Sequence, residues 1–146
     1  LSCGVSVKTI QSGLKDFKGI KGRTSLKIID NTVIIEEINP GINVTAVKRA
    51  IEMIKDLPRS MVIFGGQYGI TCEEIDEKEA SEVINQVNND IGIILTDELG
   101  ETLKDKVKRS FRYVEDYNEA VEQAQKEGYQ HILLIYRSNY PDVLHR

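Results

Sequence analysis

A glycine-rich segment is the first stretch whose residue types could serve a ligand. Residues 61–64 are apolar throughout and lead directly into Gly65, Gly66, Gln67, Tyr68 and Gly69. An unbroken apolar run is typical of a strand that is buried on both faces. Glycines after such a strand allow a sharp turn and the close approach of a ligand. Because open α/β sheets bind ligands at the carboxyl ends of their strands, we expect a crevice loop here.

The segment matches neither of the common nucleotide-binding patterns. The G-x-G-x-x-G pattern of dinucleotide-binding folds is absent, and no Lys-Ser or Lys-Thr pair follows the glycines as in a P-loop. A tight strand-to-helix turn therefore explains the glycines as well as a ligand contact does.

Charged residues form three further groups. Glu36 and Glu37 end a β-branched run, and adjacent strand residues point to opposite faces, so they are not an acid/base pair. We interpret them as solvated edge carboxylates, the alternative being that one of them faces a crevice. The acidic residues 73–79 are typical of a helix N-terminus, and the basic residues 104–112 are typical of a solvated face. No spacing of Ser, Cys, His or carboxylates indicates a metal site or a catalytic group within this chain.

Hydrophobic periodicity predicts the elements that position these groups. A helix with Ser6 as a possible N-cap is expected over 5–18, and a hairpin over 25–30 and 32–38 with its turn at Asp30-Asn31. A helix capped by Asn43 or Thr45 and stopped at Leu57-Pro58 should follow. The remaining expected helices are 74–89 and 116–126, the last capped by Asp116 or Asn118, and the remaining expected strands are 61–64, 91–96, 111–114 and 131–136. Residues 98–108 fit a short polar helix or a loop, and residues 137–146 fit a loop.

Buried strands that alternate with amphipathic helices predict an α/β, Rossmann-like three-layer domain. We expect a mostly parallel sheet with helices on both faces, preceded by an N-terminal hinge helix and a hairpin. The composition, 146 residues with 40% hydrophobic and 29% charged residues, suits one folded domain. The net charge of -4 argues against a nucleic-acid partner. Two distant cysteines, no leader and no long apolar run predict a cytoplasmic protein without a membrane partner.

Residues 10–23 carry the most specific pattern, I-x-x-G-L-x-x-F-x-G-I-x-G-R. It resembles the junction between the central and C-terminal domains of the Mur ligase family, the ATP-dependent amide-forming ligases that include the folylpolyglutamate synthetases. In that family the junction helix ends in a Gly-Arg pair, which Gly22-Arg23 matches. The resemblance implies that residues 1–22 are the end of a central ATPase domain with its hinge, and that residues 23–146 are the C-terminal domain. A first residue other than Met fits such a fragment.

The resemblance continues more loosely through the rest of the chain. Glu36-Glu37 and Asn39-Pro40 match an acidic pair and an Asn-Pro segment, with Glu in place of Asp and a shorter spacing. Alignment on the following helix puts Asn43 at the family's Asn position instead, so both asparagines stay open. The glycine segment and Thr96-Asp97 match two further strand ends. The Asn-Pro-Arg of some peptide ligases is absent at residues 98–100, and Arg137-Ser138-Asn139 replaces the family's Gly-Lys-Gly.

The resemblance implies a ligase whose site is shared between domains. The central domain would bind ATP and magnesium and phosphorylate a carboxylate, and an amine or related nucleophile would attack the acyl phosphate. Arg23 would place charge near the phosphates, with Glu36, Glu37 and Asn39 or Asn43 on the nucleotide side. The substrate crevice would be lined by Gly65, Gly66, Gln67, Tyr68, Thr96 and Asp97. The implied partners are the central and N-terminal domains of the same polypeptide and a small-molecule substrate.

Because of these departures from the peptide-ligase pattern, the chain resembles an archaeal branch of Mur-like ligases. That branch includes the synthetase of the nickel tetrapyrrole coenzyme of methanogenesis, which is favoured, and the pseudomurein peptide ligases. The alternative is a stand-alone Rossmann-like module that binds a nucleotide or a protein without catalysis. A P-loop in the upstream coding sequence would favour the ligase. Because this chain has no P-loop, we predict that it hydrolyses no ATP by itself.

Overall fold

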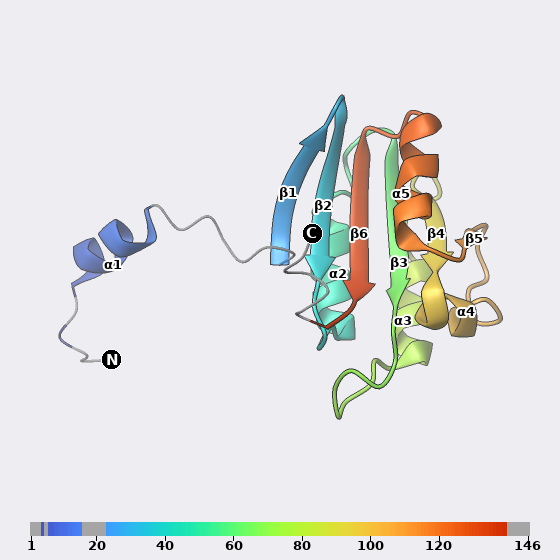
Figure 1. Ribbon diagram of the computed structural model, residues 1–146, viewed down its shortest axis with the longest axis horizontal. Helices are drawn as coiled ribbons and strands as arrows, with labels where there is room; N and C mark the ends of the chain where they lie inside the picture. The colour runs from blue at the N-terminus through green and yellow to red at the C-terminus, as the bar shows by residue number, and fades with distance from the viewer. Residues whose placement is uncertain (1–3, 5, 16–22, 140–146) are drawn as a thin grey trace.

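The computed structural model describes residues 4, 6–15 and 23–139 (Figure 1). Residues 16–22, which are half of the hinge pattern and include Gly22, and the tail 140–146 lie outside these residues. The helices are α1 (Val7–Leu14), α2 (Val44–Glu52), α3 (Glu77–Asn85), α4 (Asp97–Leu103) and α5 (Tyr117–Lys126). The strands are β1 (Arg23–Ile29), β2 (Thr32–Ile38), β3 (Ser60–Gly66), β4 (Gly92–Thr96), β5 (Arg112–Val114) and β6 (His131–Arg137). Within the described ranges, no helix is both long and apolar enough to cross a membrane.

The six strands form one sheet in the order β1-β2-β6-β3-β4-β5. β1 pairs with β2 in antiparallel fashion, and all other pairs are parallel. The carboxyl ends of β2 to β6 therefore share one edge of the sheet. Because β1 runs the opposite way, its first residue, Arg23, lies at this same edge and pairs with Glu37. The predicted hairpin and mostly parallel sheet are confirmed.

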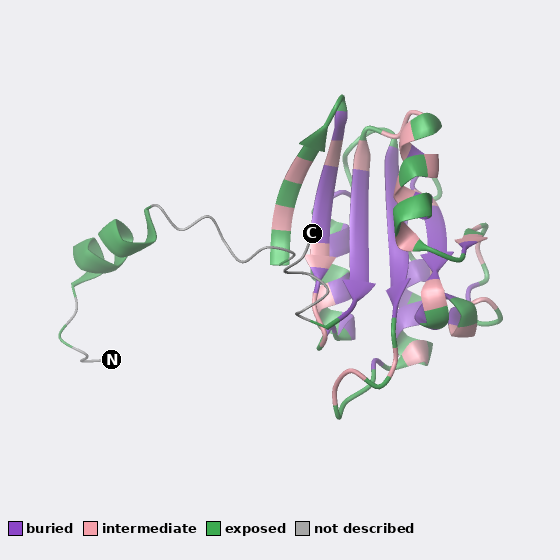
Figure 2. Ribbon diagram, in the orientation of Figure 1, coloured by how far each residue is buried: buried purple, intermediate pink, exposed green. Residues whose placement is uncertain are grey.

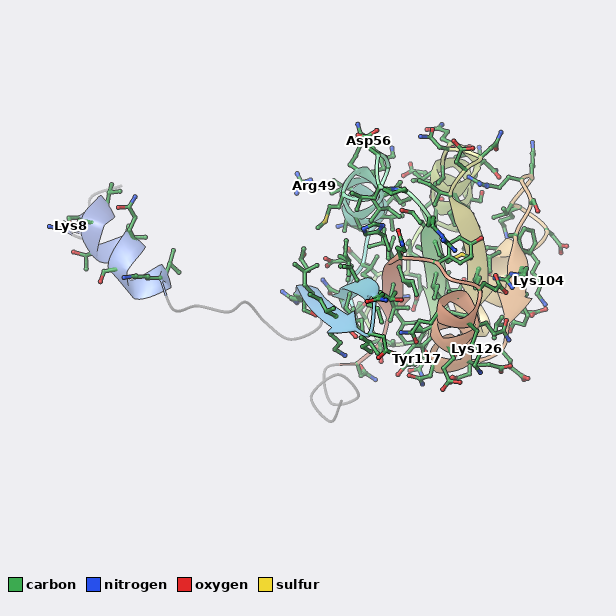
Figure 3. All side chains as sticks on the ribbon, turned by 90° about the horizontal axis from the view of Figure 1, so that it is seen from above. Lys8, Arg49, Asp56, Lys104, Tyr117 and Lys126 are labelled. Carbon is green, nitrogen blue, oxygen red and sulfur yellow. The ribbon has the colours of Figure 1, made fainter. Side chains whose placement is uncertain are left out.

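Helices cover both faces of this sheet, as expected for a three-layer domain. The connections from β2 to β5 advance in one direction across the sheet, whereas α5 leads back from β5 to β6. Right-handed crossovers therefore place α5 on the opposite face from α2, α3 and α4. Two apolar clusters fill the two interlayer spaces, one under α2, α3 and α4 and one under α5. Figure 2 shows β3 buried along its length and β6 buried after its first residue. Figure 3 shows Arg49 of α2 and Tyr117 of α5 on opposite sides.

Side-chain caps explain where α1, α2, α3 and α5 begin. The Ser6 hydroxyl accepts from Thr9 N at 3.1 Å, as predicted. Asn43 caps α2 rather than Thr45, and Asp116 caps α5 rather than Asn118. Asp76 caps α3, so this helix begins three residues later than predicted.

Other boundaries also differ from the sequence prediction: α1 spans Val7–Leu14 instead of 5–18, and α3 ends at Asn85 instead of 89. α2 ends at Glu52, before Leu57, and the chain continues in turns. Of the two forms predicted for residues 98–108, a short helix or a loop, the structure shows a helix, α4. β3 and β6 extend to Gly66 and Arg137, so Gly65, Gly66 and Arg137 belong to strands and not to the predicted loops.

Candidate functional site

Gly65 and Gly66 are closed in by the neighbouring strands. A Cβ on Gly65 would lie 2.1 Å from the Thr96 carbonyl oxygen, and one on Gly66 would lie 2.4 Å from that of Arg137. Gly66 also has φ 132°, a backbone conformation that favours glycine. The sequence prediction that a loop begins at Gly65 is therefore wrong, because close strand packing requires these two glycines. The open loop begins at Gln67, which is exposed.

Tyr68 fixes the start of that loop against two helices. Its hydroxyl donates to Glu77 Oε1 at 2.6 Å and lies 2.7 Å from the Thr102 hydroxyl. Burial, followed by the bond to Glu77, raises the pKa of Tyr68 to about 12. Lys106 lies 2.8 Å from the other oxygen of Glu77. The phenol is thus a neutral donor within a charged network, and this network holds the loop in place.

The carboxylate of Glu77 makes the stability of this network pH-dependent. The bond from Lys106, and then that from Tyr68, lowers the pKa of Glu77 below its usual value of 4.5. A lowered carboxyl pKa stabilises the fold above the unfolded pKa, and this contribution is lost as the pH falls through the folded pKa. We therefore expect the stability difference between the wild type and Glu77→Gln to shrink as the pH falls below about 4.5. Urea denaturation at several pH values measures it.

Glu79→Gln is the matched control, because Glu79 lies in the same first turn and is exposed. Its stability should follow the wild type across the whole pH range. If the free energies of unfolding of the wild type and Glu77→Gln differ by the same amount at every pH, the prediction is contradicted.

Thr96 and Asp97 lie at the end of β4, at the same edge of the sheet. Thr96 is buried, and its hydroxyl donates to Asp97 Oδ2 at 2.9 Å. Burial raises the pKa of Asp97, whose backbone has a φ of 57°. A non-glycine residue in this region is uncommon and points to a position that the surrounding structure fixes firmly.

The two glutamates of β2 have different environments. Glu36 is 6% exposed, forms an ion pair with Lys27 at 2.6 Å and accepts from the Ser25 hydroxyl at 3.0 Å. The interpretation of Glu36 as a solvated carboxylate is therefore wrong, since β1 covers it. Glu37 points to the other face and accepts from the Thr24 hydroxyl at 2.7 Å. The predicted alternation of the two faces holds.

A cavity of about 450 Å³ lies beside Glu37, on the α2 side of the sheet. We call it the α2 cavity; its lining consists of Thr24, Glu37, Asn43, Thr45, Ala46, Arg49, Ala50 and Met53. It brings together Glu37 and Asn43, but neither Glu36 nor Asn39. A register shift between Arg23 and Ser25, with Thr24 at φ 49°, shapes its rim. Such bulges are common beside functional sites.

The groups around the α2 cavity suit a nucleotide. Carboxylate, amide and hydroxyl groups can bond a base or a sugar, and Arg49 adds a positive charge suited to phosphate. The side chain of Asn43 lines the α2 cavity and also caps α2, because its Oδ1 accepts a hydrogen bond from Ala46 N at 2.9 Å. Asn39 instead accepts from Gly41 N at 2.9 Å and shapes a turn. No group of three His, Cys, Asp or Glu side chains that could hold a metal occurs within the described ranges.

Arg137 is the residue that the sequence prediction missed. It was expected in a loop, yet it is 1% exposed and bonds to Pro40, Thr71, Glu73 and Glu74. Burial lowers its pKa. No periodic signal reveals a buried arginine that follows an apolar strand. Only the contacts of the fold show that its charge is paired.

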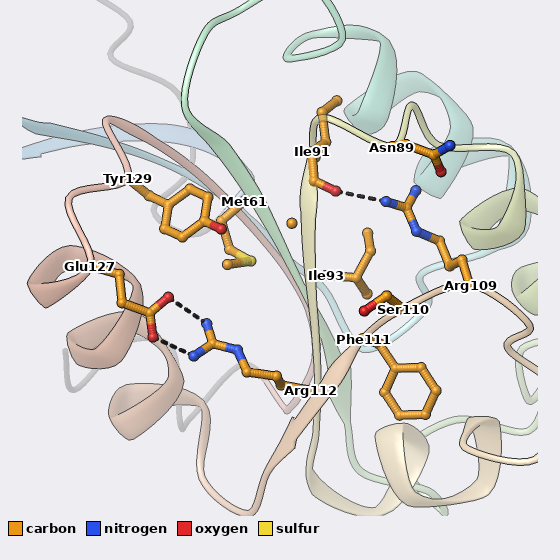
Figure 4. A pocket seen from close by; sticks show the side chains of 11 residues that line it. Met61, Asn89, Ile91, Ile93, Arg109, Ser110, Phe111, Arg112, Glu127 and Tyr129 are labelled. Atoms are coloured by element: carbon orange, nitrogen blue, oxygen red, sulfur yellow. Dashed lines mark hydrogen bonds and ion pairs between the residues drawn. The ribbon is translucent and has the colours of Figure 1, made fainter.

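Another cavity, of about 500 Å³, lies at the opposite edge of the sheet (Figure 4). Its two arginines already have partners. Arg109 donates to the carbonyls of Val87, Asn88 and Ile91, and Arg112 forms an ion pair with Glu127. The basic segment is therefore not simply a solvated face: Arg109 is half-buried and caps the end of the α3 region. These two arginines support the fold. The candidate site therefore lies at the edge of the sheet where β2 to β6 end, which we call the carboxyl edge.

Comparison with known proteins identifies a matching family model and a sequence relative. Residues 26–139 match the family model described as "Coenzyme F430 synthetase CfbE, C-terminal domain". The coenzyme F(430) synthetase of Methanocaldococcus jannaschii is 34% identical over 115 residues. That match covers 79% of this chain but 27% of the relative, so the chain spans about a quarter of its length.

Solved structures share the fold at low sequence identity. MurF from Acinetobacter baumannii aligns with a TM-score of 0.65 at 16% identity, covering 97% of this chain and 33% of that one. The bifunctional folylpolyglutamate synthase/dihydrofolate synthase from Yersinia pestis, complexed with AMPPNP and a Mn ion, also gives 0.65, at 14% identity, covering 92% of this chain and 32% of that one. The predicted resemblance to the C-terminal domain of Mur-like ligases is confirmed.

Proposed function

The chain belongs to the coenzyme F430 synthetase C-terminal domain family, and from this we propose that it is the C-terminal part of a cytoplasmic, Mur-like ATP-dependent ligase. The ligase would join a carboxylate to an amine or related nucleophile through an acyl phosphate, in the reaction that forms coenzyme F430. ATP and magnesium would be bound mainly by a central domain of the same polypeptide. The family match favours this reaction over pseudomurein peptide ligation.

The observation that carries the proposal is the arrangement of polar groups at the carboxyl edge. Arg23 begins β1 opposite Glu37, and Glu37 shares the α2 cavity with Asn43 and Arg49. We assign Glu37 and Asn43 to the nucleotide base or sugar, and the positive charge of Arg23 to the phosphates. The exposed Gln67 and the half-buried Asp97 lie further along the same edge, where an incoming substrate would bind.

Helix α1 supports the proposed boundary between residues 1–22 and 23–146. It has no buried residue, and its apolar residues Val7, Ile10 and Leu14 are 70%, 49% and 58% exposed. Their spacing places them on one side of the helix. Such a stripe requires an apolar partner, and we propose that the central domain supplies it.

ATP turnover tests the proposal. The purified chain mixed with ATP and magnesium should release no sustained phosphate, because it has no P-loop. The complete polypeptide should convert ATP to ADP only when its carboxylate substrate is present. Sustained phosphate release by the isolated chain would contradict the division of labour. ATP binding by the chain, without ligation by the complete polypeptide, would favour the stand-alone nucleotide-binding module.

A further inference from the structure

The backbone of Arg137 is fixed by the end of β3. Gln67 N donates to the Arg137 carbonyl at 2.9 Å, and Gly66 leaves no room there for a side chain. A buried guanidinium is costly unless its donors are paired. The direction of this side chain, and the groups it meets, are therefore determined by the sheet.

The guanidinium reaches two loops that are distant in sequence. Its Nε donates to the Pro40 carbonyl at 3.0 Å, in the loop 39–43 between β2 and α2. One terminal nitrogen donates to the Thr71 hydroxyl at 2.7 Å and to the Glu73 carbonyl at 2.8 Å, in the loop 67–76 between β3 and α3. The other terminal nitrogen forms an ion pair with Glu74. Two of the three nitrogens thus donate hydrogen bonds, while the third is held by the ion pair with Glu74 alone and makes no hydrogen bond within the described part of the chain.

Glu74 closes the second loop on itself. Its Oε1 accepts from Gly69 N at 2.9 Å, while its Oε2 pairs with Arg137. The two loops together border a cavity of about 370 Å³, lined by Gly41, Ile42, Asn43, Thr71, Cys72, Glu73 and Glu74. Asn43 lines both this cavity and the α2 cavity. The network around Arg137 therefore connects the loop 67–76 to a residue of the candidate nucleotide site.

We propose that Arg137 is a positioning residue that couples these two loops, so that the Arg137–Glu74 ion pair sets the position of Asn43. The consequence for nucleotide affinity rests on the proposed function, whereas the coupling itself does not. A shift of the loop 67–76 moves the guanidinium, which in turn moves Pro40 and the turn before α2. The side chain of Asn43 is then already oriented when the nucleotide binds, which lowers the entropic cost of binding.

Amide hydrogen exchange in this chain tests the coupling directly. Glu74→Gln removes one charge on a side chain that is 40% exposed, so the fold should survive. We expect exchange at Gly41 and Ile42 to quicken by about threefold to tenfold, although Glu74 itself bonds to Gly69 and Arg137. Glu73→Gln is the matched control, because only the main-chain carbonyl of Glu73 bonds to Arg137. Changes confined to residues 67–76 would overturn the coupling.

The complete polypeptide carries the second measurement. Glu74→Gln should raise the KM for ATP by about threefold to tenfold with a smaller change in kcat, and Glu73→Gln should not. An unchanged KM together with faster exchange at Gly41 would overturn the role in nucleotide binding. If the wild-type polypeptide shows no ATP-dependent ligation, the proposed function fails, and the exchange result still decides the coupling.

Discussion

Replacing Gly65 with alanine should destabilise the domain by about 3 kcal/mol or more. The added Cβ would lie 2.1 Å from the Thr96 carbonyl oxygen and 2.8 Å from its carbonyl carbon. These are backbone atoms of β4, so no rotation of a side chain relieves the clash. β3 must separate from β4 or bend, and both strands are buried at this point. Urea denaturation of the purified chain measures the loss.

Gly69→Ala provides the comparison for this substitution. Gly69 lies in the same segment and has a φ of 71°, but nothing lies within 4 Å of its added Cβ. Only backbone strain should act, at about 1 kcal/mol. Equal losses for the two variants would show that strand packing is not what Gly65 provides.

Local chemistry made much of the fold predictable from the sequence. The helix beginnings at Ser6, Asn43 and Asp116 follow from side chains that can accept a backbone N–H. The hairpin follows from Asp30, whose φ of 53° suits Asn or Asp in a turn. Continuous apolar runs revealed the central strands because these are buried on both faces.

Long-range contacts account for what the sequence did not reveal. The burial of Glu36 depends on Lys27 and Ser25 of a neighbouring strand, and a carboxylate beside a β-branched run looks the same whether or not it has partners. Arg137 is separated by 97 residues from Pro40, which accepts from its Nε. Such pairs have no local period, so only the assembled sheet shows them.

The candidate site shows the same division. Sequence resemblance left Asn39 and Asn43 as alternatives, and the structure separates their environments without testing their roles. Asn43 lines the α2 cavity beside Glu37, whereas Asn39 shapes a turn that leads to it. The helix cap made by Asn43 and the bulge at Thr24 both arise from short-range backbone geometry, yet the two residues meet only where β1 and α2 line the same cavity. On this basis Asn43 is the stronger candidate for the nucleotide contact.

In the complete polypeptide, Arg23→Ala should lower kcat by about 10³-fold, with a smaller effect on the KM for ATP. An arginine brought to the transferring phosphoryl group stabilises charge that develops in the transition state, so its loss appears mainly in kcat. Arg23 is exposed at the first position of β1, and because exposed polar contacts contribute little, its removal should change the stability of the chain by no more than about 1 kcal/mol. Steady-state kinetics with thermal denaturation of the same variants separate the two effects.

Two further variants make the assignment of Arg23 specific. Arg23→Lys keeps the charge but loses the planar pair of donors, so it should restore only part of kcat. Arg112→Ala removes an exposed arginine at the opposite edge of the sheet and should leave kcat unchanged, since its partner there is Glu127. Full activity in Arg23→Ala would remove the phosphate contact from the mechanism and leave Arg23 as a hinge residue. The two arginines carry the same charge but lie at opposite edges of the sheet. An equal loss of kcat in Arg112→Ala and Arg23→Ala would therefore show that the effect does not depend on the position of the arginine.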